Sequence, residues 1–564
     1  MRTALPGRRG PALIGQALTG SGCFLLLAAM ASVPVFAQTQ AKPPSFAGPY
    51  KIAGTVTNAA TGDPLQHAIL SALGEDSRRT VATVVADAQG HFEIAGLAAA
   101  KYPLTASKRG YHTAFYDDHD GFNTAIVTGP DQDTTHLAFR LTSTAILRGV
   151  VTADGGDPVE NARVMLFEKP RPNWTNQRTI QIETAVTDDT GAYEFADLRG
   201  GEYLVAVAAQ PWYAMHSGIQ VSNGGVRVVG QTNPQLDVAY PVTYFDSTTE
   251  EASATTITLT SGSREEANLN LHAVPALRIG VEVPVRADGK LARPEMQQIV
   301  FGSPVSAESV GFLDAMATAK TEFNGVAPGL YELTLGDPPR IVDLNATESG
   351  EVDPNSGIGT VAVSGVLRIV GETKAPPEAH LFLQQQEGSP SHANRVAAAR
   401  DGRFNLEALA PGTWAVSVEI GGKMLSVVGI ATEEGTHAGN LITVRDRPLT
   451  LTVLMNASGT SRMDGFAQKD GKGFAGALVL LVPRNPAQLQ TLSRRDQSDS
   501  DGSFSLRDVV PGSYTVVAIE DGWDSDWLRQ GAIARFLPRG TAVTVRNTPG
   551  GRFVLAGPVT VQPR

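Results

Sequence analysis

Short stretches of alternating apolar and polar residues recur along most of this chain. Phe404 and Leu406 alternate with polar neighbours, as do Phe504 and Leu506, which is the two-residue period that turns one face of a β-strand inward. Other stretches, such as residues 203–207 and 514–519, are continuous, of strand length and rich in β-branched and aromatic residues. Outside the first 37 residues, no long segment shows helical spacing of its apolar residues. The pattern predicts an all-β protein.

The predicted strands belong to a unit that repeats. Each copy has a turn carrying Asp and Gly, an aromatic residue two positions after the Gly, and a second aromatic ten residues after the first. The aromatic pairs are Phe92/Tyr102, Tyr193/Tyr203, Phe404/Trp414 and Phe504/Tyr514. A degenerate copy keeps Phe323 and Tyr331 but has lost the Asp and Gly turn. We expect the repeated aromatics to lie in the cores.

A second pattern precedes each copy. Gly54-Thr55-Val56 and Gly149-Val150-Val151 each lead to an Asp-Pro turn and then to a segment with Ala, while Gly365-Val366 and Gly465-Phe466 lead to similar apolar segments. The order of the parts is the same in four copies, so one fold is repeated in tandem. Short strands with a turn signal every 8–12 residues are typical of β-sandwiches.

These repeats predict the domain organisation. We expect β-sandwiches at 48–144, 145–272, 273–358, 359–457 and 458–564, the third of them degenerate.

The first 37 residues have the features of a secretory signal peptide. Arg2, Arg8 and Arg9 form a basic start, residues 24–31 form a short apolar core, and Val35-Phe36-Ala37 fits a cleavage site. The apolar core is too short for a transmembrane helix, so no membrane anchor is expected in the mature chain. The sequence predicts an exported protein of the periplasm, of the outer-membrane surface or of the medium.

Composition narrows the function. The chain has 46 basic and 57 acidic residues, a net charge of −11 and no basic cluster, which excludes a typical nucleic-acid-binding protein. Its one Cys, Cys23, lies in the predicted signal and cannot build a disulfide framework. No His begins a His-x-x-Glu or His-Glu-x-x-His motif, and there is no Gly-x-Ser-x-Gly or P-loop. We therefore expect that the protein is not an enzyme and that it has no catalytic residue, metal-binding residue or cofactor.

The repeated motifs resemble the carboxypeptidase regulatory-like domain, a transthyretin-like β-sandwich that is also grouped with the carbohydrate-binding-like fold. The resemblance is carried by the Gly-x-Val opening, the Pro-(Leu/Val)-x-x-Ala segment, the Asp-Gly-x-Phe turn and the Pro-Gly-x-Tyr turn. It implies a tandem array of transthyretin-like sandwiches of the kind found in exported bacterial multi-domain proteins. It implies no peptidase activity, because the family is named after a non-catalytic domain.

Three clusters are candidates for ligand or metal binding. Tyr111, His112, Tyr116, Asp117, Asp118, His119 and Asp120 suit a metal or a sugar, or else form a solvated loop. Asp499, Asp501, Gly502 and Asp508 loosely resemble a calcium loop, although a hairpin turn explains them better. The third cluster comprises aromatics outside the repeat pattern, Trp174, Trp212, Tyr213, Trp523 and Trp527, with Asp524 and Asp526 between the last two. Such rings stack on sugars, or else they cap the open ends of the sandwiches.

The sequence therefore favours a non-catalytic exported binding module, with carbohydrate as the first ligand class to test. The predicted ligand contacts are Trp212, Tyr213, Trp523, Asp524 and Trp527. One alternative is a structural stalk or scaffold that partners other envelope proteins. Another is a regulatory partner of a separate peptidase or transporter.

Overall fold

The computed structural model confirms an all-β protein. It describes residues 48–564 except 75–78, 120, 171–178, 217, 223–224, 230–232, 283–293, 307–310, 316–319, 336–338, 354–355, 371, 387–393, 422, 426, 457–461, 487–488, 526, 528–530 and 547–550. The predicted signal peptide lies outside these residues. Within the described ranges, no helix has both the length and the apolar character needed to cross a membrane.

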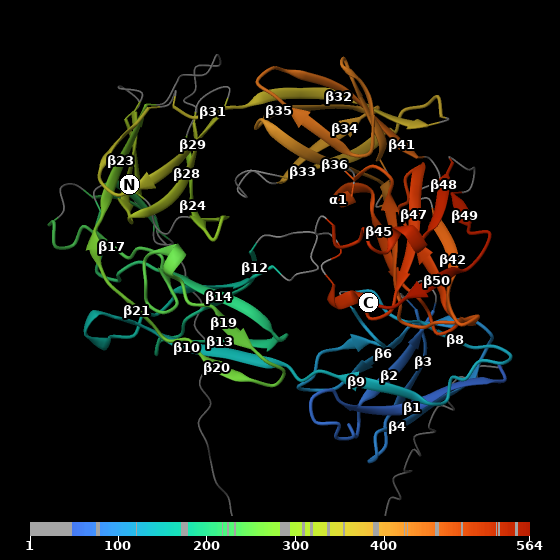
Figure 1. Ribbon diagram of the computed structural model, residues 1–564. Coiled ribbons are helices and arrows are strands. Elements are labelled where there is room, and N and C mark those ends of the chain that lie inside the picture. The colour runs from blue at the N-terminus through green and yellow to red at the C-terminus, as the bar shows by residue number, and fades with distance from the viewer. Residues whose placement is uncertain are drawn as a thin grey trace, which may run out of the picture. The chain divides into compact units, whose positions relative to one another are not determined.

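We assign the described strands to five groups, which we call units 1 to 5 (Figure 1). Strand pairs lie within a unit, except for one short pair that links units 2 and 3. Unit 1 comprises β1 (Tyr50–Asn58), β2 (Ile69–Leu73), β3 (Thr80–Val85), β4 (His91–Leu97), β5 (Lys101–Tyr102), β6 (Leu104–Ser107), β7 (Ala114–Phe115), β8 (Ile126–Val127) and β9 (Leu137–Leu141). Unit 2 comprises β10 (Ala145–Ala153), η1 (Asp154–Gly156), β11 (Arg163–Glu168), β12 (Ile180–Val186), β13 (Ala192–Leu198), β14 (Gly201–Ala208), β17 (Val238–Ala239), β18 (Thr243–Tyr244), η2 (Glu251–Ser253), β19 (Ile257–Leu259), β20 (Arg264–Glu266) and β21 (Leu269–Leu271).

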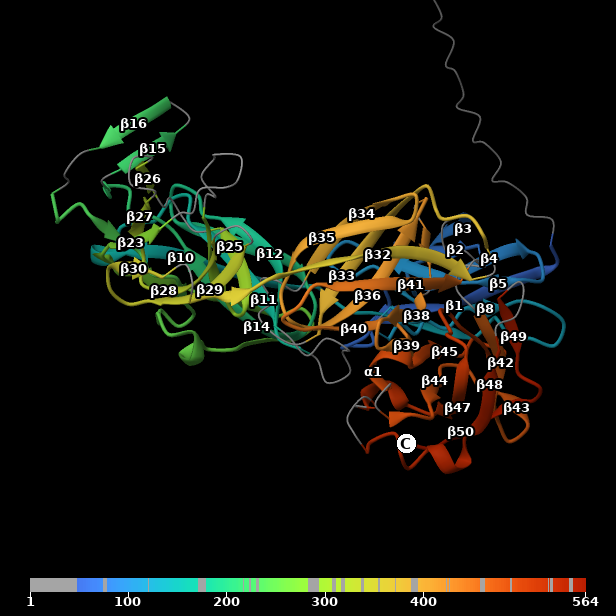
Figure 2. The ribbon, with the colours of Figure 1, turned by 90° about the horizontal axis from the view of Figure 1, so that it is seen from above.

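Unit 3 comprises β15 (Gly218–Ser222), β16 (Gly225–Val229), β22 (Val274–Pro275), β23 (Leu277–Glu282), β24 (Glu295–Val300), β25 (Ser303–Ser306), β26 (Gly311–Ala315), β27 (Lys320–Val326), β28 (Gly329–Leu335), β29 (Arg340–Ala346), β30 (Gly350–Val352) and β31 (Ile358–Gly359). The β15–β16 hairpin falls within the predicted second domain, yet it pairs with β26 through Ile219 and Phe312, as Figure 2 shows. Strand pairing therefore does not follow chain order at this point.

Unit 4 comprises β32 (Val361–Val370), β33 (Glu378–Gln385), β34 (Asn394–Arg400), β35 (Arg403–Leu409), β36 (Gly412–Ile420), β37 (Lys423–Leu425), β38 (Val427–Thr432), β39 (Gly435–Ala438), β40 (Leu441–Val444) and β41 (Leu449–Asn456). Unit 5 comprises β42 (Arg462–Lys469), β43 (Lys472–Gly473), β44 (Leu478–Pro483), α1 (Leu489–Leu492), β45 (Arg494–Gln497), β46 (Ser503–Leu506), β47 (Gly512–Ile519), η5 (Gly522–Asp524), η6 (Leu537–Arg539), β48 (Thr541–Val545), β49 (Arg552–Val554) and β50 (Val559–Gln562).

The same pairing closes every unit. One strand pairs antiparallel with the strand that follows the predicted turn and parallel with a strand at the end of the unit. In unit 1 these are β1 with β4 and β9, and in unit 2 β10 with β13, β20 and β21. The equivalent sets in units 3 to 5 are β23 with β27 and β30, β32 with β35 and β41, and β42 with β46, β49 and β50.

A glycine and an aromatic residue face each other in this pairing. The glycine of the opening motif lies directly opposite the first aromatic residue in four units: Gly54 and Phe92, Gly149 and Tyr193, Gly365 and Phe404, Gly465 and Phe504. A Cβ atom on Gly54, Gly149 or Gly365 would come closer than 3.0 Å to a backbone carbonyl oxygen at the closing strand. On Gly465 it would lie 2.6 Å from the ring of Phe504. Because glycine has no side chain, both the closing strand and the aromatic ring can lie close to the opening strand.

The second aromatic residue anchors the turn that precedes it in all five units. Its polar atom donates a hydrogen bond to the carbonyl oxygen four residues earlier, at 2.7 to 3.2 Å. The pairs are Tyr102 with Ala98, Tyr203 with Arg199, Tyr331 with Ala327, Trp414 with Ala410 and Tyr514 with Val510. This contact satisfies the phenol or indole inside the core and resembles the tyrosine corner of other β-sandwiches.

Each unit has its own hydrophobic core. All ten aromatics of the repeat pattern, including the degenerate pair Phe323 and Tyr331, are buried, which confirms that they are core residues. A further apolar cluster joins unit 2 to unit 3 through Met165 and Phe167 of β11 and Val300 of β24.

The glycine contact gives a test of the fold. We expect Gly54→Ala to lower the local unfolding free energy of unit 1 by about 2 kcal/mol or more, because the new methyl group overlaps the backbone at Leu137. Hydrogen exchange of residues 50–58 and 137–141 measures the change. Gly129→Ala is the matched control, since no atom lies within 4 Å of a Cβ atom there. Equal effects of the two substitutions would contradict this account.

Candidate functional site

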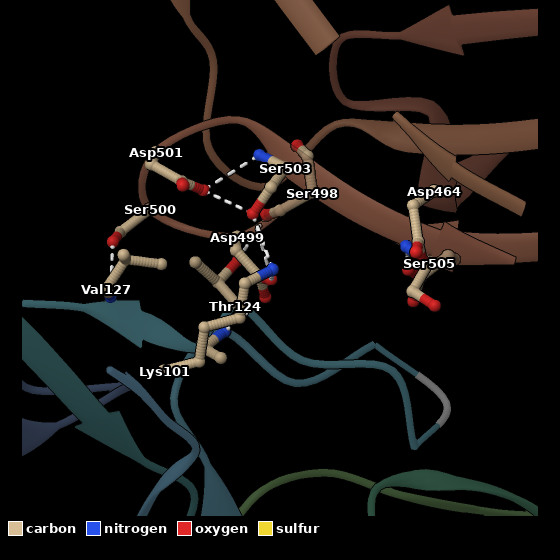
Figure 3. A network of polar contacts seen from close by, with 12 residues as sticks. Lys101, Thr124, Val127, Asp464, Ser498, Asp499, Ser500, Asp501, Ser503 and Ser505 are labelled. Carbon is tan, nitrogen blue, oxygen red and sulfur yellow. Dashed lines mark hydrogen bonds and ion pairs between the residues drawn. The ribbon is translucent and has the colours of Figure 1, made fainter. Parts of the chain in front are cut away.

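Residues from all three candidate clusters meet where unit 1 contacts unit 5. Figure 3 shows the part of this contact that includes Lys101, Asp499 and Ser500. The hydrogen-bonded partners are 373 to 402 positions apart in the chain. Unit 1 contributes Lys101 and residues 117–127, and unit 5 contributes residues 495–503 and Trp523.

An ion pair and backbone hydrogen bonds set the register of this contact. The Lys101 ammonium donates to the Asp499 carboxylate at 2.6 Å, and the backbone amide of Ala125 donates to the same carboxylate at 3.0 Å. The amide of Ser500 donates to the carbonyl of Ala125 at 3.0 Å, and the amide of Val127 donates to the Ser500 hydroxyl at 2.8 Å. Because main-chain atoms take part on both sides, the contact has one defined alignment.

The Gln497 side chain is enclosed within the contact, with 1% of the residue exposed. Its amide nitrogen lies 2.6 Å from the carbonyl oxygen of Asp117 and 2.8 Å from the hydroxyl of Thr124. Its amide oxygen lies 3.0 Å from Nδ1 of His119. A buried amide with partners on both of its atoms fixes the loop of unit 1 against β45.

An aromatic group lies beside these polar contacts. The Trp523 ring stacks on His119 and on Phe122, each with a centroid distance of 5.5 Å. The Arg495 guanidinium lies 4.9 Å from the Phe122 centroid and 5.9 Å from the Trp527 centroid. Trp523 and Trp527 are only 6% and 4% exposed, so neither ring presents a free face for a ligand in this structure.

The turn of unit 5 differs from its counterparts in units 1 and 2. The carboxylates of Asp87 and Asp188 accept hydrogen bonds from amides of their own turns, and Asp188 also accepts one from the Thr190 hydroxyl. The amide of His91 lowers the pKa of Asp87 most, and the Thr190 hydroxyl, followed by the amides, lowers the pKa of Asp188. In unit 5 the carboxylate of Asp501 accepts from the amide of Ser503 at 2.8 Å. Asp499, the counterpart of Asp87, instead reaches unit 1, and burial raises its pKa.

The other residues of the first cluster have separate partners. His112 Nε2 lies 2.9 Å from the carbonyl of Leu198 in unit 2, and Tyr116 packs edge-on against Phe139 in the core of unit 1. Asp118 accepts from the amide of Gly121, and Asp120 lies outside the described residues. Nowhere in the described ranges are three His, Cys, Asp or Glu side chains placed to hold a metal.

On the segment after β14, the exposed Trp212 lies beside the half-buried Tyr213. Trp212 is 92% exposed, and the two ring centroids lie 5.7 Å apart at an interplanar angle of 84°. Of the remaining predicted residues, Trp174 and Asp526 lie outside the described residues, and for Asp524 the structure describes only the backbone, at the end of η5. The structure thus separates the predicted ligand contacts into a pair that includes an exposed ring and a buried pair.

A carboxypeptidase regulatory-like domain model matches this chain twice, at residues 51–142 and 146–238. Two successive segments of the chain are thus similar to a carboxypeptidase regulatory-like domain. The first supplies the unit 1 side of the contact with unit 5, and the second carries Trp212 and Tyr213. The family is a regulatory-like domain, not a peptidase catalytic domain.

Several known proteins are similar to parts of the chain. Colossin-A of Dictyostelium discoideum is 22% identical over 386 residues, which cover 60% of this chain and 3% of that protein. The chain therefore spans a small part of that relative's length.

Among solved structures, the chain is similar to GBS52, the minor pilin of Streptococcus agalactiae. The match has 13% identity and a TM-score of 0.19, and it covers 40% of this chain and 97% of that chain. The Bacillus anthracis TIE protein has 9% identity, coverage of 91% and 73%, and a TM-score of 0.16. BcpA, the major pilin subunit of Bacillus cereus, has 10% identity, coverage of 72% and 99%, and a TM-score of 0.13.

The second matched segment, residues 146–238, also holds a buried polar group that no sequence motif indicated. His216, 1% exposed, lies 2.9 Å from Asp237 through Nδ1 and 3.1 Å from the Gln210 amide through Nε2. Arg278 of unit 3 donates to the other Asp237 oxygen at 2.9 Å. Burial acts to raise the pKa of Asp237, but hydrogen bonds from His216 and Arg278 outweigh it, and the pKa is lowered. With Nε2 facing an amide, the group links two units instead of activating a nucleophile.

Asp496 of β45 gives a pH-dependent prediction. Burial raises its pKa from 3.8 to about 7, with a further contribution from Asp499. The folded state then binds this proton more tightly than the unfolded state, so the contribution of Asp496 to stability falls as pH rises from about 4 to 7. We expect Asp496→Asn to stabilise unit 5 by about 1–3 kcal/mol at pH 8 and to have little effect near pH 4.

Hydrogen exchange of residues 494–506, corrected for the intrinsic effect of pH, measures this difference. Asp188→Asn is the control, because the pKa of Asp188 is lowered and its loss should not stabilise the protein at pH 8. A pH-independent effect of Asp496→Asn would contradict the prediction.

Proposed function

We propose that this protein is a non-catalytic exported scaffold whose tandem β-sandwiches hold other molecules of the cell envelope. The observation that carries the proposal is the use of candidate functional side chains from three clusters, Asp499, His119 and Trp523 among them, to join units 1 and 5. Side chains committed to such contacts serve assembly and not chemistry. Export rests on the signal peptide predicted at residues 1–37.

The separate cores support this role. A tandem array in which each unit has its own core presents several surfaces along one chain, and strand edges are natural sites for adding a strand of a partner. Among the described strands, β12 ends its sheet and exposes Ile182 and Val186, which are 39% and 61% accessible. Such an edge suits an extended segment of an envelope protein.

In-cell photo-cross-linking tests the scaffold function. A photo-reactive residue at Ile182 of the exported chain is expected to give a discrete adduct with an envelope protein, identified by mass spectrometry. The control places the same residue at Val554, an apolar position of β49 that is 62% exposed and so at least as accessible as Ile182. If position 182 gives only the background seen from position 554, β12 is not a partner site.

Carbohydrate binding is the second candidate, and one observation favours it. Trp212 is almost fully exposed beside Tyr213, and two perpendicular rings offer flat apolar faces to the C–H faces of a sugar. The other predicted contacts add no exposed ring, because Trp523 and Trp527 are buried.

A glycan-array and insoluble-polysaccharide screen of the exported chain, with and without calcium, tests this candidate. We expect Trp212→Ala to weaken any binding at least tenfold. Phe466→Ala, which removes an exposed aromatic residue of β42, should leave binding unchanged. Binding that survives Trp212→Ala, or no binding at high protein concentration, would reject this site.

A further inference from the structure

We propose that the surfaces joining unit 1 to unit 5 also join two copies of this chain, with unit 5 of one copy seated on unit 1 of another. The partner is a second copy of the protein, and the assembly is head-to-tail. This inference rests on the proposed scaffold function and adds to it how the scaffold would extend.

Each side of the contact belongs to a unit that is complete without the other. Ile52, Leu70 and Phe139 belong to the core of unit 1, whereas Met463 and Val516 belong to the separate core of unit 5. Neither surface therefore needs the other in order to fold.

The connection between the two surfaces is long. The contacting residues are at least 373 positions apart, so closure within one chain depends on a long connection through three other units. A long connection gives a modest effective concentration, and at high local concentration a second copy competes with closure.

The two surfaces are complementary but different. Unit 1 presents the Lys101 ammonium and the amides of Ala125 and Val127, all of which donate hydrogen bonds. Unit 5 presents the Asp499 carboxylate and the Ser500 hydroxyl, which accept them. A contact between unlike surfaces is heterologous, so one pairing between two copies leaves a free surface at each end.

The turn of unit 5 is built for this outward contact. Asp501 takes over the capping of the turn by accepting the Ser503 amide, and this frees Asp499 to bind unit 1 (Figure 3). The matching Asp87 and Asp188 cap their own turns, and unit 4 has Ala399 at this position. Among these four turns only unit 5 has the outward carboxylate, so the contact has one direction along the chain.

The stacked rings give the contact an apolar part. The Trp523 ring stacks on His119 and Phe122 of unit 1 and is 6% exposed, so the contact buries aromatic rings as well as an ion pair. Buried aromatic residues are the kind of group that dominates the binding energy of protein interfaces.

Charge reversal separates closure within a chain from pairing between chains. Lys101→Glu places a second carboxylate against Asp499, and Asp499→Lys places a second ammonium against Lys101, so neither variant closes on itself. In a mixture, the unchanged Lys101 of the Asp499→Lys chain meets the unchanged Asp499 of the Lys101→Glu chain. The introduced carboxylate of one chain likewise meets the introduced ammonium of the other. Both pairings between chains are therefore attractive.

We expect each variant alone to be monomeric and the equimolar mixture to double its mass in light scattering. The wild type and the double variant Lys101→Glu/Asp499→Lys should stay mostly monomeric at the same concentration, because both can close on themselves. A mixture that stays monomeric would overturn the proposal.

A second measurement covers the case in which charge reversal perturbs the units. The Lys101→Glu chain receives Ser500→Cys, the Asp499→Lys chain receives Val127→Cys, and Cys23→Ser is present in both. We expect an intermolecular disulfide, because the Ser500 hydroxyl and the Val127 amide are 2.8 Å apart in the contact. In the control, Asp189→Cys of unit 2, at the position that matches Ser500, replaces Ser500→Cys. This pair of chains should form no intermolecular disulfide.

A result as weak as the control would overturn pairing between copies. It would leave the scaffold function untouched, since cross-linking from position 182 tests that function independently.

Discussion

The architecture depends on the close approach of chain segments at one glycine in four of the five units. At Gly54, Gly149, Gly365 and Gly465 the opening strand lies opposite an aromatic residue, and at the first three it also touches the backbone at the closing strand. A side chain at these positions would separate the strands whose parallel pairing closes the unit. Closure completes each core locally, so the chain is a series of separately packed units. Surfaces outside the cores are then free to differ from unit to unit.

The turn before the first aromatic residue shows how such a difference arises. In units 1 and 2 the first Asp of the turn accepts amides of the turn itself, which is a local structural role. In unit 5 a second Asp two residues later takes this role, and the first becomes available for Lys101. One extra carboxylate in an otherwise unchanged turn thus converts a structural residue into a contact residue. The fold stays the same while its surface gains a specific partner.

The candidate site was only partly predictable. The sequence singles out Asp117, His119, Asp499, Asp501, Trp523 and Trp527 because their chemistry suits metals or ligands. The structure uses four of them, Asp117, His119, Asp499 and Trp523, between units of one chain, whereas Asp501 and Trp527 contact residues of unit 5. Residue type indicates which groups bind, but not what they bind, when the partner lies nearly 400 positions away. His216, Asp237 and Arg278 were missed because each has ordinary neighbours in the chain, and only folding brings the three together. Trp212 and Tyr213 are adjacent in the chain, and Trp212 remains exposed.

The sequence by itself determined the fold class, the repeat and the buried aromatics. Two-residue alternation, glycine turns and strand-length apolar stretches act over distances of a few residues, and their physical consequences can be read locally. Only the tertiary structure decided which surfaces meet, that β15 and β16 join a sheet of unit 3, and that Trp523 is covered while Trp212 is exposed. These outcomes depend on shape and hydrogen-bond complementarity between surfaces distant in the chain, and no local pattern of residues encodes that complementarity.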